Sequence, residues 1–208
     1  MKKVLWYFII ASFIWAAAVP AQENALIAAL KKKYGEKSSL ELTFTLDIFW
    51  KVREKKERKD GLLQIMPGDK FRLKLGSWTW VCDGHTYWQY NEKTEQVIIK
   101  NLLDIALAMH PSQMMKTYLS YDFTVKGGDA KETIFQWRNP AGDKQKEYSA
   151  ITLHVDKKKT EITKIVAVDS KGNINTYTFS RTKTGVRFPE NTFSFTPPKG
   201  VEVIDTRD

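Results

Sequence analysis

The chain has one cysteine, Cys82, and only three histidines in 208 residues, which excludes several classes of protein. A single thiol allows no internal disulfide and no cysteine-based zinc or iron–sulfur site. Eleven glycines and seven prolines are too few for a collagen-like or low-complexity chain, and an apolar fraction of 42% is ordinary for a globular one. The motifs of zinc proteases, serine hydrolases and phosphate-binding glycine loops are also missing.

Long hydrophobic runs are missing too, apart from the one at the start of the chain. Met1-Lys2-Lys3 precedes an apolar run from Val4 to Val19, and Val19-Pro20-Ala21 closes it with small residues. This layout predicts a cleaved secretory signal over residues 1–21, a mature domain over 22–208 and a periplasmic location. An uncleaved anchor is the alternative, although the run is slightly short for a bilayer core of ~30 Å.

The mature chain begins with a helical pattern and then changes period. Leu26, Ile27 and Leu30 share one face of a predicted helix over Glu23–Lys33, whose last turn is basic. From Leu40 to Trp50 apolar residues alternate with mostly polar ones, which predicts a long, half-buried strand.

Further short runs separated by turn signals predict the other strands of a sheet of about ten. They are Leu62–Met66, Phe71–Leu75, Trp78–Cys82, Thr86–Tyr90, Gln96–Lys100, Tyr121–Val125, Thr133–Trp137, Tyr148–Asp156, Glu161–Asp169, Asn173–Ser180 and Thr192–Phe195. Neighbours this close along the chain are expected to be antiparallel. Residues 101–120 interrupt the pattern with two short apolar helices that break at His110-Pro111. The predicted fold is mainly β: one large curved antiparallel sheet and a helical segment.

A catalytic site has little support in this pattern. Cys82 and His85 are neighbours, but Cys82 shares strand parity with Trp78 and Trp80, which favours a small buried residue over a nucleophile. Carboxylates are plentiful, so an Asp/Glu pair assembled by folding stays open. No cofactor or metal is predicted.

Two basic segments coincide with expected turns of a chain whose formal net charge is +9. Residues 51–59 carry six positive and two negative charges, and residues 157–159 are three lysines. Solvated hairpin tips explain both, and attraction to an anionic membrane surface or to an acidic partner is the alternative. The aromatic residues lack the interleaved basic pattern of a nucleic-acid platform, so no nucleic-acid partner is expected.

The apolar residues point to a container. The short helices are apolar on nearly every side and must cover the apolar face of the sheet, with methionines that can repack around variable contents. A separable cover over such a face is typical of a site for an apolar ligand. The residues expected to line it are Leu42, Phe44, Leu46, Ile48, Trp50, Phe71, Leu73, Trp78, Trp80 and Trp88, and those of the lid are Leu103, Leu107, Met114 and Met115.

Three segments resemble the periplasmic lipoprotein carriers of the LolA family. Val81-Cys82-Asp83-Gly84-His85-Thr86-Tyr87-Trp88-Gln89-Tyr90 is similar to the family's Asp-Gly hairpin. The ending Phe193-Ser194-Phe195-Thr196-Pro197-Pro198-Lys199-Gly200-Val201-Glu202-Val203-Ile204-Asp205 is similar to its C-terminal signature. The segment Ser39-Leu40-Glu41-Leu42-Thr43-Phe44 is similar to its first long strand. The order of the predicted elements also follows the family across the mature chain.

The resemblance implies an unclosed β-barrel with a helical lid, and a soluble, monomeric, non-enzymatic carrier. Such a carrier takes acylated lipoproteins from an inner-membrane ABC lipoprotein exporter to an outer-membrane acceptor. Phe71 matches a family phenylalanine expected to contact acyl chains or the exporter. The family's arginine before the proline, which is thought to hold the lid, is replaced by Met66. A lipid-binding sensor or regulator on the same fold is the first alternative, and a periplasmic hydrolase the second.

Overall fold

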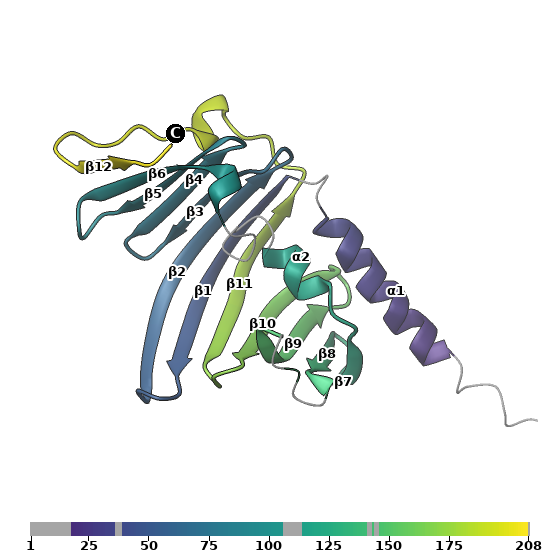
Figure 1. Ribbon diagram of the computed structural model, residues 1–208. Coiled ribbons are helices and arrows are strands. Elements are labelled where there is room, and N and C mark those ends of the chain that lie inside the picture. The colour runs from purple at the N-terminus through teal and green to yellow at the C-terminus, as the bar shows by residue number, and fades with distance from the viewer. Residues whose placement is uncertain (1–17, 36–38, 106–113, 141–142, 144–145, 208) are drawn as a thin grey trace, which may run out of the picture.

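A single twelve-stranded sheet dominates the computed structural model, which describes residues 18–35, 39–105, 114–140, 143 and 146–207 (Figure 1). Of residues 18–24 and of Met114 it describes the backbone alone. The strands are β1 (Leu40–Trp50), β2 (Lys55–Met66), β3 (Lys70–Leu75), β4 (Trp78–Asp83), β5 (Thr86–Asn91), β6 (Gln96–Asn101), β7 (Thr124–Gly128), β8 (Glu132–Arg138), β9 (Tyr148–Asp156), β10 (Glu161–Asp169), β11 (Ile174–Thr184) and β12 (Glu202–Asp205).

The sheet consists of two meanders joined at their first and last strands. Its order is β12-β6-β5-β4-β3-β2-β1-β11-β10-β9-β8-β7, so the long β1–β11 pair connects the two halves. β12 and β7 are the two edges and do not pair with each other, which confirms the prediction of a large, curved and unclosed sheet. The prediction of a purely antiparallel sheet was wrong in one place, because β12 runs parallel to β6.

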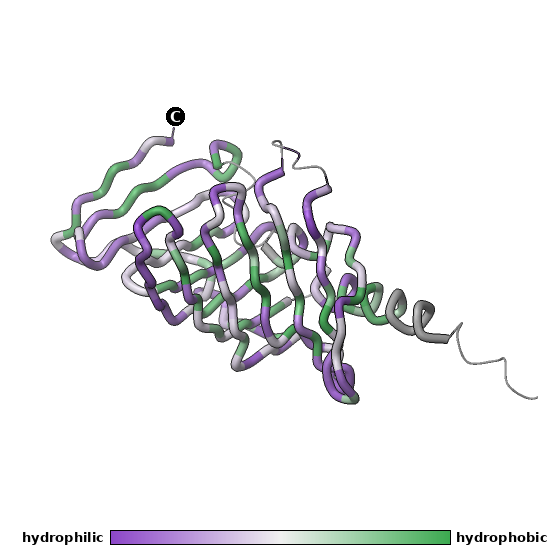
Figure 2. Tube along the Cα trace, turned by 90° about the horizontal axis from the view of Figure 1, so that it is seen from below, coloured by the Kyte–Doolittle hydropathy of each residue, from purple (hydrophilic) through white to green (hydrophobic). Residues whose placement is uncertain are grey.

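The alternation along β1 gives the sheet two chemically different faces. Leu40, Leu42, Phe44, Leu46 and Ile48 are all buried on one side, here called the inner face, whereas the residues between them are partly exposed on the outer face. Figure 2 shows the same alternation of hydrophobic and hydrophilic residues along many strands. A residue's face is therefore fixed by the register of the pairing.

Two predicted boundaries differ from the structure for identifiable reasons. β2 begins at Lys55 rather than Leu62, because its polar first half pairs with β1 along the whole strand, from Trp50↔Lys55 onward. The predicted strand Thr192–Phe195 is instead a 3₁₀ helix, η5 (Glu190–Phe193), that buries Phe193 against the outer face.

Helical elements cover parts of the inner face. They are α1 (Ala18–Lys33), η1 (Leu102–Asp104) and α2 (Met114–Leu119). The expected helical interruption of the strand pattern is present on both sides of residues 106–113. Residues 106–113, which include Leu107, His110 and Pro111, lie outside the described residues. Among the described helices, none has both the length and the apolarity needed to cross a bilayer.

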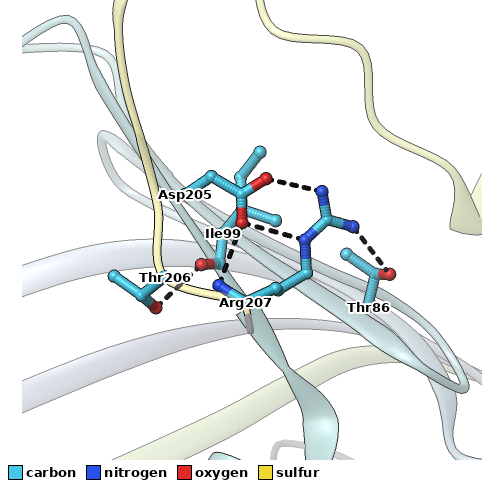
Figure 3. A network of polar contacts seen from close by, with 5 residues as sticks. All are labelled: Thr86, Ile99, Asp205, Thr206 and Arg207. Carbon is cyan, nitrogen blue, oxygen red and sulfur yellow. Dashed lines mark hydrogen bonds and ion pairs between the residues drawn. The ribbon is translucent and has the colours of Figure 1, made fainter.

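The C-terminal segment is fastened to the outer face and to the edge of the sheet. Arg72 Nη1 on β3 donates to the carbonyl oxygens of Thr192, at 3.2 Å, and Ser194, at 3.4 Å. Beyond β12, Arg207 forms an ion pair with Asp205 and donates to Thr86 Oγ1, while Thr206 Oγ1 donates to the carbonyl oxygen of Ile99 (Figure 3). Arg207 holds the pKa of Asp205 at about 2.

Candidate functional site

An apolar region of the inner face stays partly exposed between two helical covers. The inner face continues from β2 to β4 through three cross-strand pairs, Ile65↔Phe71, Leu73↔Trp80 and Leu75↔Trp78. The inner-face patch, as we call it, consists of Ile65, Leu73, Leu75, Trp78 and Trp80, each half-buried. The rings of Trp78 and Trp80 are stacked, with centroids 5.7 Å apart. The patch combines aliphatic and flat aromatic surface with no charged side chain among its five members.

One cover, α2, lies on the inner face of the β1–β11 half. Its residues Met115, Tyr118 and Leu119 are buried in the same cluster as Leu42, Phe44, Leu46 and Ile48 of β1. Leu30 and Tyr34 of α1 join this cluster, and the Tyr34 hydroxyl accepts a hydrogen bond from the Ile162 N–H at 3.2 Å. Four residues predicted to line the site thus belong to the same buried cluster as α2 and are not accessible in this conformation.

Tyrosine contacts fasten α2 to the sheet. The ring of Tyr118 lies 5.6 Å from that of Tyr148 on β9 and 5.9 Å from that of Tyr177 on β11, centroid to centroid. The hydroxyls of Tyr118 and Tyr148 are 3.5 Å apart. Burial raises the pKa of Tyr118 well above its ordinary value, so the hydroxyl stays neutral at physiological pH. Tyr118 therefore contacts Tyr148 and Tyr177 through its ring and through a neutral hydroxyl.

The second cover is η1 with the residue after it. Phe71, Cys82 and Tyr87 are buried together on the inner face, and Leu102 and Ile105 pack against them. Leu103, which was expected in the lid, is 97% exposed, so its two apolar neighbours occupy the covering position instead. Burial raises the pKa of Cys82 to about 11, so the thiol stays protonated at neutral pH and is poorly suited to be a nucleophile.

Trp50 on the inner face has a buried polar atom without a hydrogen-bond partner among the described residues. Trp50 ends β1 and packs against the buried cluster that includes α2 and the inner residues of β1, and its Nε1 is buried. A buried donor without a partner is costly, and a water molecule or a bound ligand can satisfy it. A ligand oxygen would satisfy it. The sequence placed Trp50 in the site as apolar surface but gave no sign of this donor.

Trp88 does not share the face of the other predicted tryptophans. The register pairs Trp88 with Val81 and Trp80 with Gln89, which puts Trp88 on the outer face. There it lies opposite Ile99, on the side of the sheet to which the C-terminal segment is fastened. The structure thus brings together nine of the ten predicted lining residues on one face and separates Trp88 from them. Of the lid residues, Met115 lies over that face, and the side chains of Leu107 and Met114 are outside the description.

A shallow pocket at the sheet end near η1 offers a different chemistry. It has a volume of about 350 Å³ and is lined by Gly84, His85, Asn101, Leu102, Leu103 and Asp104. Across the described part of the chain, no three His, Cys, Asp or Glu side chains are grouped in a way that could hold a metal ion. The inner-face patch is accordingly the stronger candidate for a binding site.

Known proteins share both the sequence pattern and the architecture. The family model described as outer membrane lipoprotein carrier protein LolA matches residues 38–196. An outer-membrane lipoprotein carrier protein of Chromobacterium violaceum is 29% identical over 98% of both chains, and one of Neisseria gonorrhoeae is 26% identical over 96% of both. An uncharacterised conserved protein of Thermus thermophilus has a similar solved structure, with a TM-score of 0.55 at 17% identity, covering 89% of this chain and 99% of that one.

Proposed function

Because the chain belongs to the LolA family of outer membrane lipoprotein carrier proteins, we propose that it is a periplasmic carrier that shuttles lipoproteins from the inner to the outer membrane. The observation that carries this proposal is the half-exposed apolar inner-face patch lying between two helical covers. Acyl chains of the cargo lie on this face and replace the contacts that the covers make in the empty protein.

Transfer energies explain why such a carrier is needed. Each buried methylene is worth ~0.8 kcal/mol, so exposing one sixteen-carbon chain to water costs on the order of 12 kcal/mol. A carrier must also release its cargo. Contacts of acyl chains with Leu42 and Phe44 resemble those made by Met115 and Leu119 in the empty state, so loading and unloading differ little in energy.

The indole of Trp50 gives the proposed site a polar anchor. Its unsatisfied Nε1 donates to a carbonyl oxygen of the ester or amide bond that links an acyl chain to the cargo. A binding site for a lipid is expected to be mostly apolar and to contain a few polar groups, and one such hydrogen bond agrees with that composition. In this proposal the chain runs along the inner face from Trp50 toward the stacked rings of Trp78 and Trp80.

The lid of this chain is held by tyrosine rather than arginine. Met66 stands where the family has an arginine, and its pairing with Lys70 puts it on the outer face. The contacts of Tyr118 with Tyr148 and Tyr177 serve as the closure. Because these contacts are mainly apolar, acyl chains can replace them without leaving a buried charge unpaired.

The remaining parts of the proposal concern location and partners. Residues 1–21 act as a cleaved export signal, and residues 22–208 are the working domain. The carrier is a monomer that receives acylated lipoproteins from an inner-membrane ABC exporter and delivers them to an outer-membrane acceptor. It is not an enzyme and needs no cofactor.

Native mass spectrometry of the protein from its own periplasm tests the cargo. We expect triacylated lipoprotein to co-purify with the protein. We also expect that the protein, once emptied of cargo, binds a synthetic triacylated lipopeptide and that binding changes its tryptophan fluorescence. Bound phospholipid without any affinity for the lipopeptide would contradict lipoprotein transport. Hydrolysis of an ester without retention of lipid would favour an enzyme, and affinity for a signalling protein alone would favour a regulator.

A further inference from the structure

The hairpin that joins β1 to β2 ends in a strongly basic tip. We call residues 51–59 the basic tip: they include six cationic and two acidic side chains. β1 and β2 pair up to Trp50↔Lys55, so residues 55–59 of the tip belong to β2 and residues 51–54 form the turn. In Figure 1 this hairpin projects at the lower end of the sheet, away from the C-terminal segment.

Three of these six cations lie within ion-pair distance of a carboxylate, and two of the three share the same one. Glu57 pairs with both Lys55, at 3.2 Å, and Lys59, at 3.4 Å, and Arg58 lies 3.8 Å from Asp47. Lys51, Arg53 and Lys56 are exposed and form no ion pair within the described residues. Their charge is therefore available to an external anion.

The turn that forms the basic tip also presents an apolar side chain to solvent. Val52 is 88% exposed and stands between Lys51 and Arg53. An isolated exposed valine needs no explanation, but one flanked by two free cations has the composition of an interfacial anchor.

A second turn lies beside the first and adds another cation. The Lys51 N–H donates to Asn173 Oδ1 at 3.0 Å, and the Lys51 stem lies over Gly172. The β10–β11 turn is thus packed against the basic tip, and it carries the exposed Lys171. Lys171 has no carboxylate partner within the described part of the chain either. The two turns form one basic end of the sheet.

We propose that the basic tip docks on the surface of a membrane rich in anionic phospholipid. Lys51, Arg53 and Lys56 contact headgroup phosphates while Val52 enters the interfacial region. β1 leads directly from this tip to Trp50 and Ile48 on the inner face, so docking places one end of that face at the membrane surface. This surface interaction goes beyond the proposed carriage of lipoproteins and does not depend on the cargo.

Vesicle co-sedimentation of the exported, processed protein tests the proposal. Vesicles of phosphatidylglycerol and phosphatidylcholine are compared with vesicles of phosphatidylcholine alone, without lipoprotein. We expect binding to the anionic vesicles only, weakening as salt screens the charges. The triple variant Lys51→Gln, Arg53→Gln, Lys56→Gln should weaken binding by roughly a hundredfold.

A second basic turn provides a matched control. The variant Lys157→Gln, Lys158→Gln, Lys159→Gln removes the same charge from the β9–β10 turn, which presents no apolar side chain. We expect it to weaken binding by less than about fivefold, through the loss of net charge alone. Equal losses in the two triple variants would overturn the assignment to the basic tip, and so would undiminished binding of the first variant. Circular dichroism checks that both variants are folded.

An environment-sensitive fluorophore on Val52→Cys tests entry into the interface. Cys82 is fully buried, so the new thiol is labelled selectively. We expect a blue shift with anionic vesicles, and none for the same label on Lys158→Cys. The absence of a shift at position 52 would contradict insertion. Binding to an acidic polypeptide with none to vesicles would overturn the proposal in favour of a protein partner.

Discussion

The ring of Phe44 on β1 lies directly over Gly61 on β2, where a Cβ atom would come within 2.3 Å of the ring. A glycine in a strand usually weakens it, but here the missing side chain provides the space for a buried aromatic ring. We expect Gly61→Ala to push the ring out of place and to lower the free energy of unfolding by about 2 kcal/mol. Urea denaturation measures the change.

Gly127 is the matched control for this substitution. It also lies in a strand, β7, and nothing is within 4 Å of its added Cβ. Gly127→Ala should change the free energy of unfolding by less than about 0.5 kcal/mol. Similar values for the two variants would mean that Phe44 can move aside freely, and that Gly61 is not required for the packing of the inner face.

Opposite faces of the sheet should respond differently to a bound acyl chain. Trp80 belongs to the inner-face patch, whereas Trp88 faces the other way. A lipopeptide with brominated acyl chains should quench the fluorescence of the protein, and Trp80→Phe should remove much of that quenching. Trp88→Phe should leave it nearly unchanged. If instead Trp88→Phe removes it, the chain binds on the outer face.

Cys82 reports whether η1 moves away from the inner face. Its thiol is buried with Phe71 and Tyr87, and burial raises its pKa to about 11. At pH 8 only about 0.1% is thiolate, so a maleimide should react far more slowly than with a free cysteine. The rate should climb with pH up to about 11. Rapid labelling of the native protein at pH 8 would show that η1 opens frequently.

The contacts of Arg72 should matter more than those of its neighbour on the same strand face. Arg72→Met removes the two hydrogen bonds to the carbonyl oxygens of Thr192 and Ser194 and should cost about 1–2 kcal/mol of unfolding free energy. Lys74→Met removes only an exposed ion pair with Glu92 and should cost less than about 1 kcal/mol. Thermal and urea unfolding compare the two. No measurable loss for Arg72→Met would mean that the apolar contacts of η5 are enough to hold it.

Much of the sheet was predictable because its signal is local. The strict alternation along Leu40–Trp50 and the turn at Asp83-Gly84 each specify their own conformation, and both are present. Gly84 adopts a φ of 100°, and Asp83 Oδ1 accepts hydrogen bonds from the N–H groups of His85 and Thr86 at 2.8 Å. Here sequence and structure agree because neighbouring residues make the contacts.

The misplaced elements depend on contacts that are distant in sequence. The face of Trp88 follows from its pairing with Val81, and alternation within its own strand cannot reveal which face is inner. β12 is exposed along its length, so its four residues carry no burial pattern, and its partner β6 lies about a hundred residues earlier. The segment Thr192–Phe195 resembles a strand in composition, but Phe193 is buried through a 3₁₀ turn.

The candidate site was predicted as a set of apolar residues but not as a geometry. The sequence identified the inner residues of β1 and the two tryptophans of β4, which alternation places on one face of each strand. It did not reveal that Leu102 and Ile105 would form one cover and Tyr118 another, because an apolar helix of two turns contains no signal for its partner. Nor did it reveal the unpaired Nε1 of Trp50, which exists only once the surroundings are packed.

The order of the strands also determines when the molecule can become complete during its synthesis and export. β1 to β6 follow one another and can form hairpins as soon as they emerge, but the other edge of β1 waits for β11, which pairs Leu40 with Thr184. Such distant pairing is slow, and open strand edges invite association with other chains. The edge of β6 is the last to be paired, because β12 comes from the last few residues. A chain cut short near its C-terminus should therefore aggregate even though its apolar face is intact.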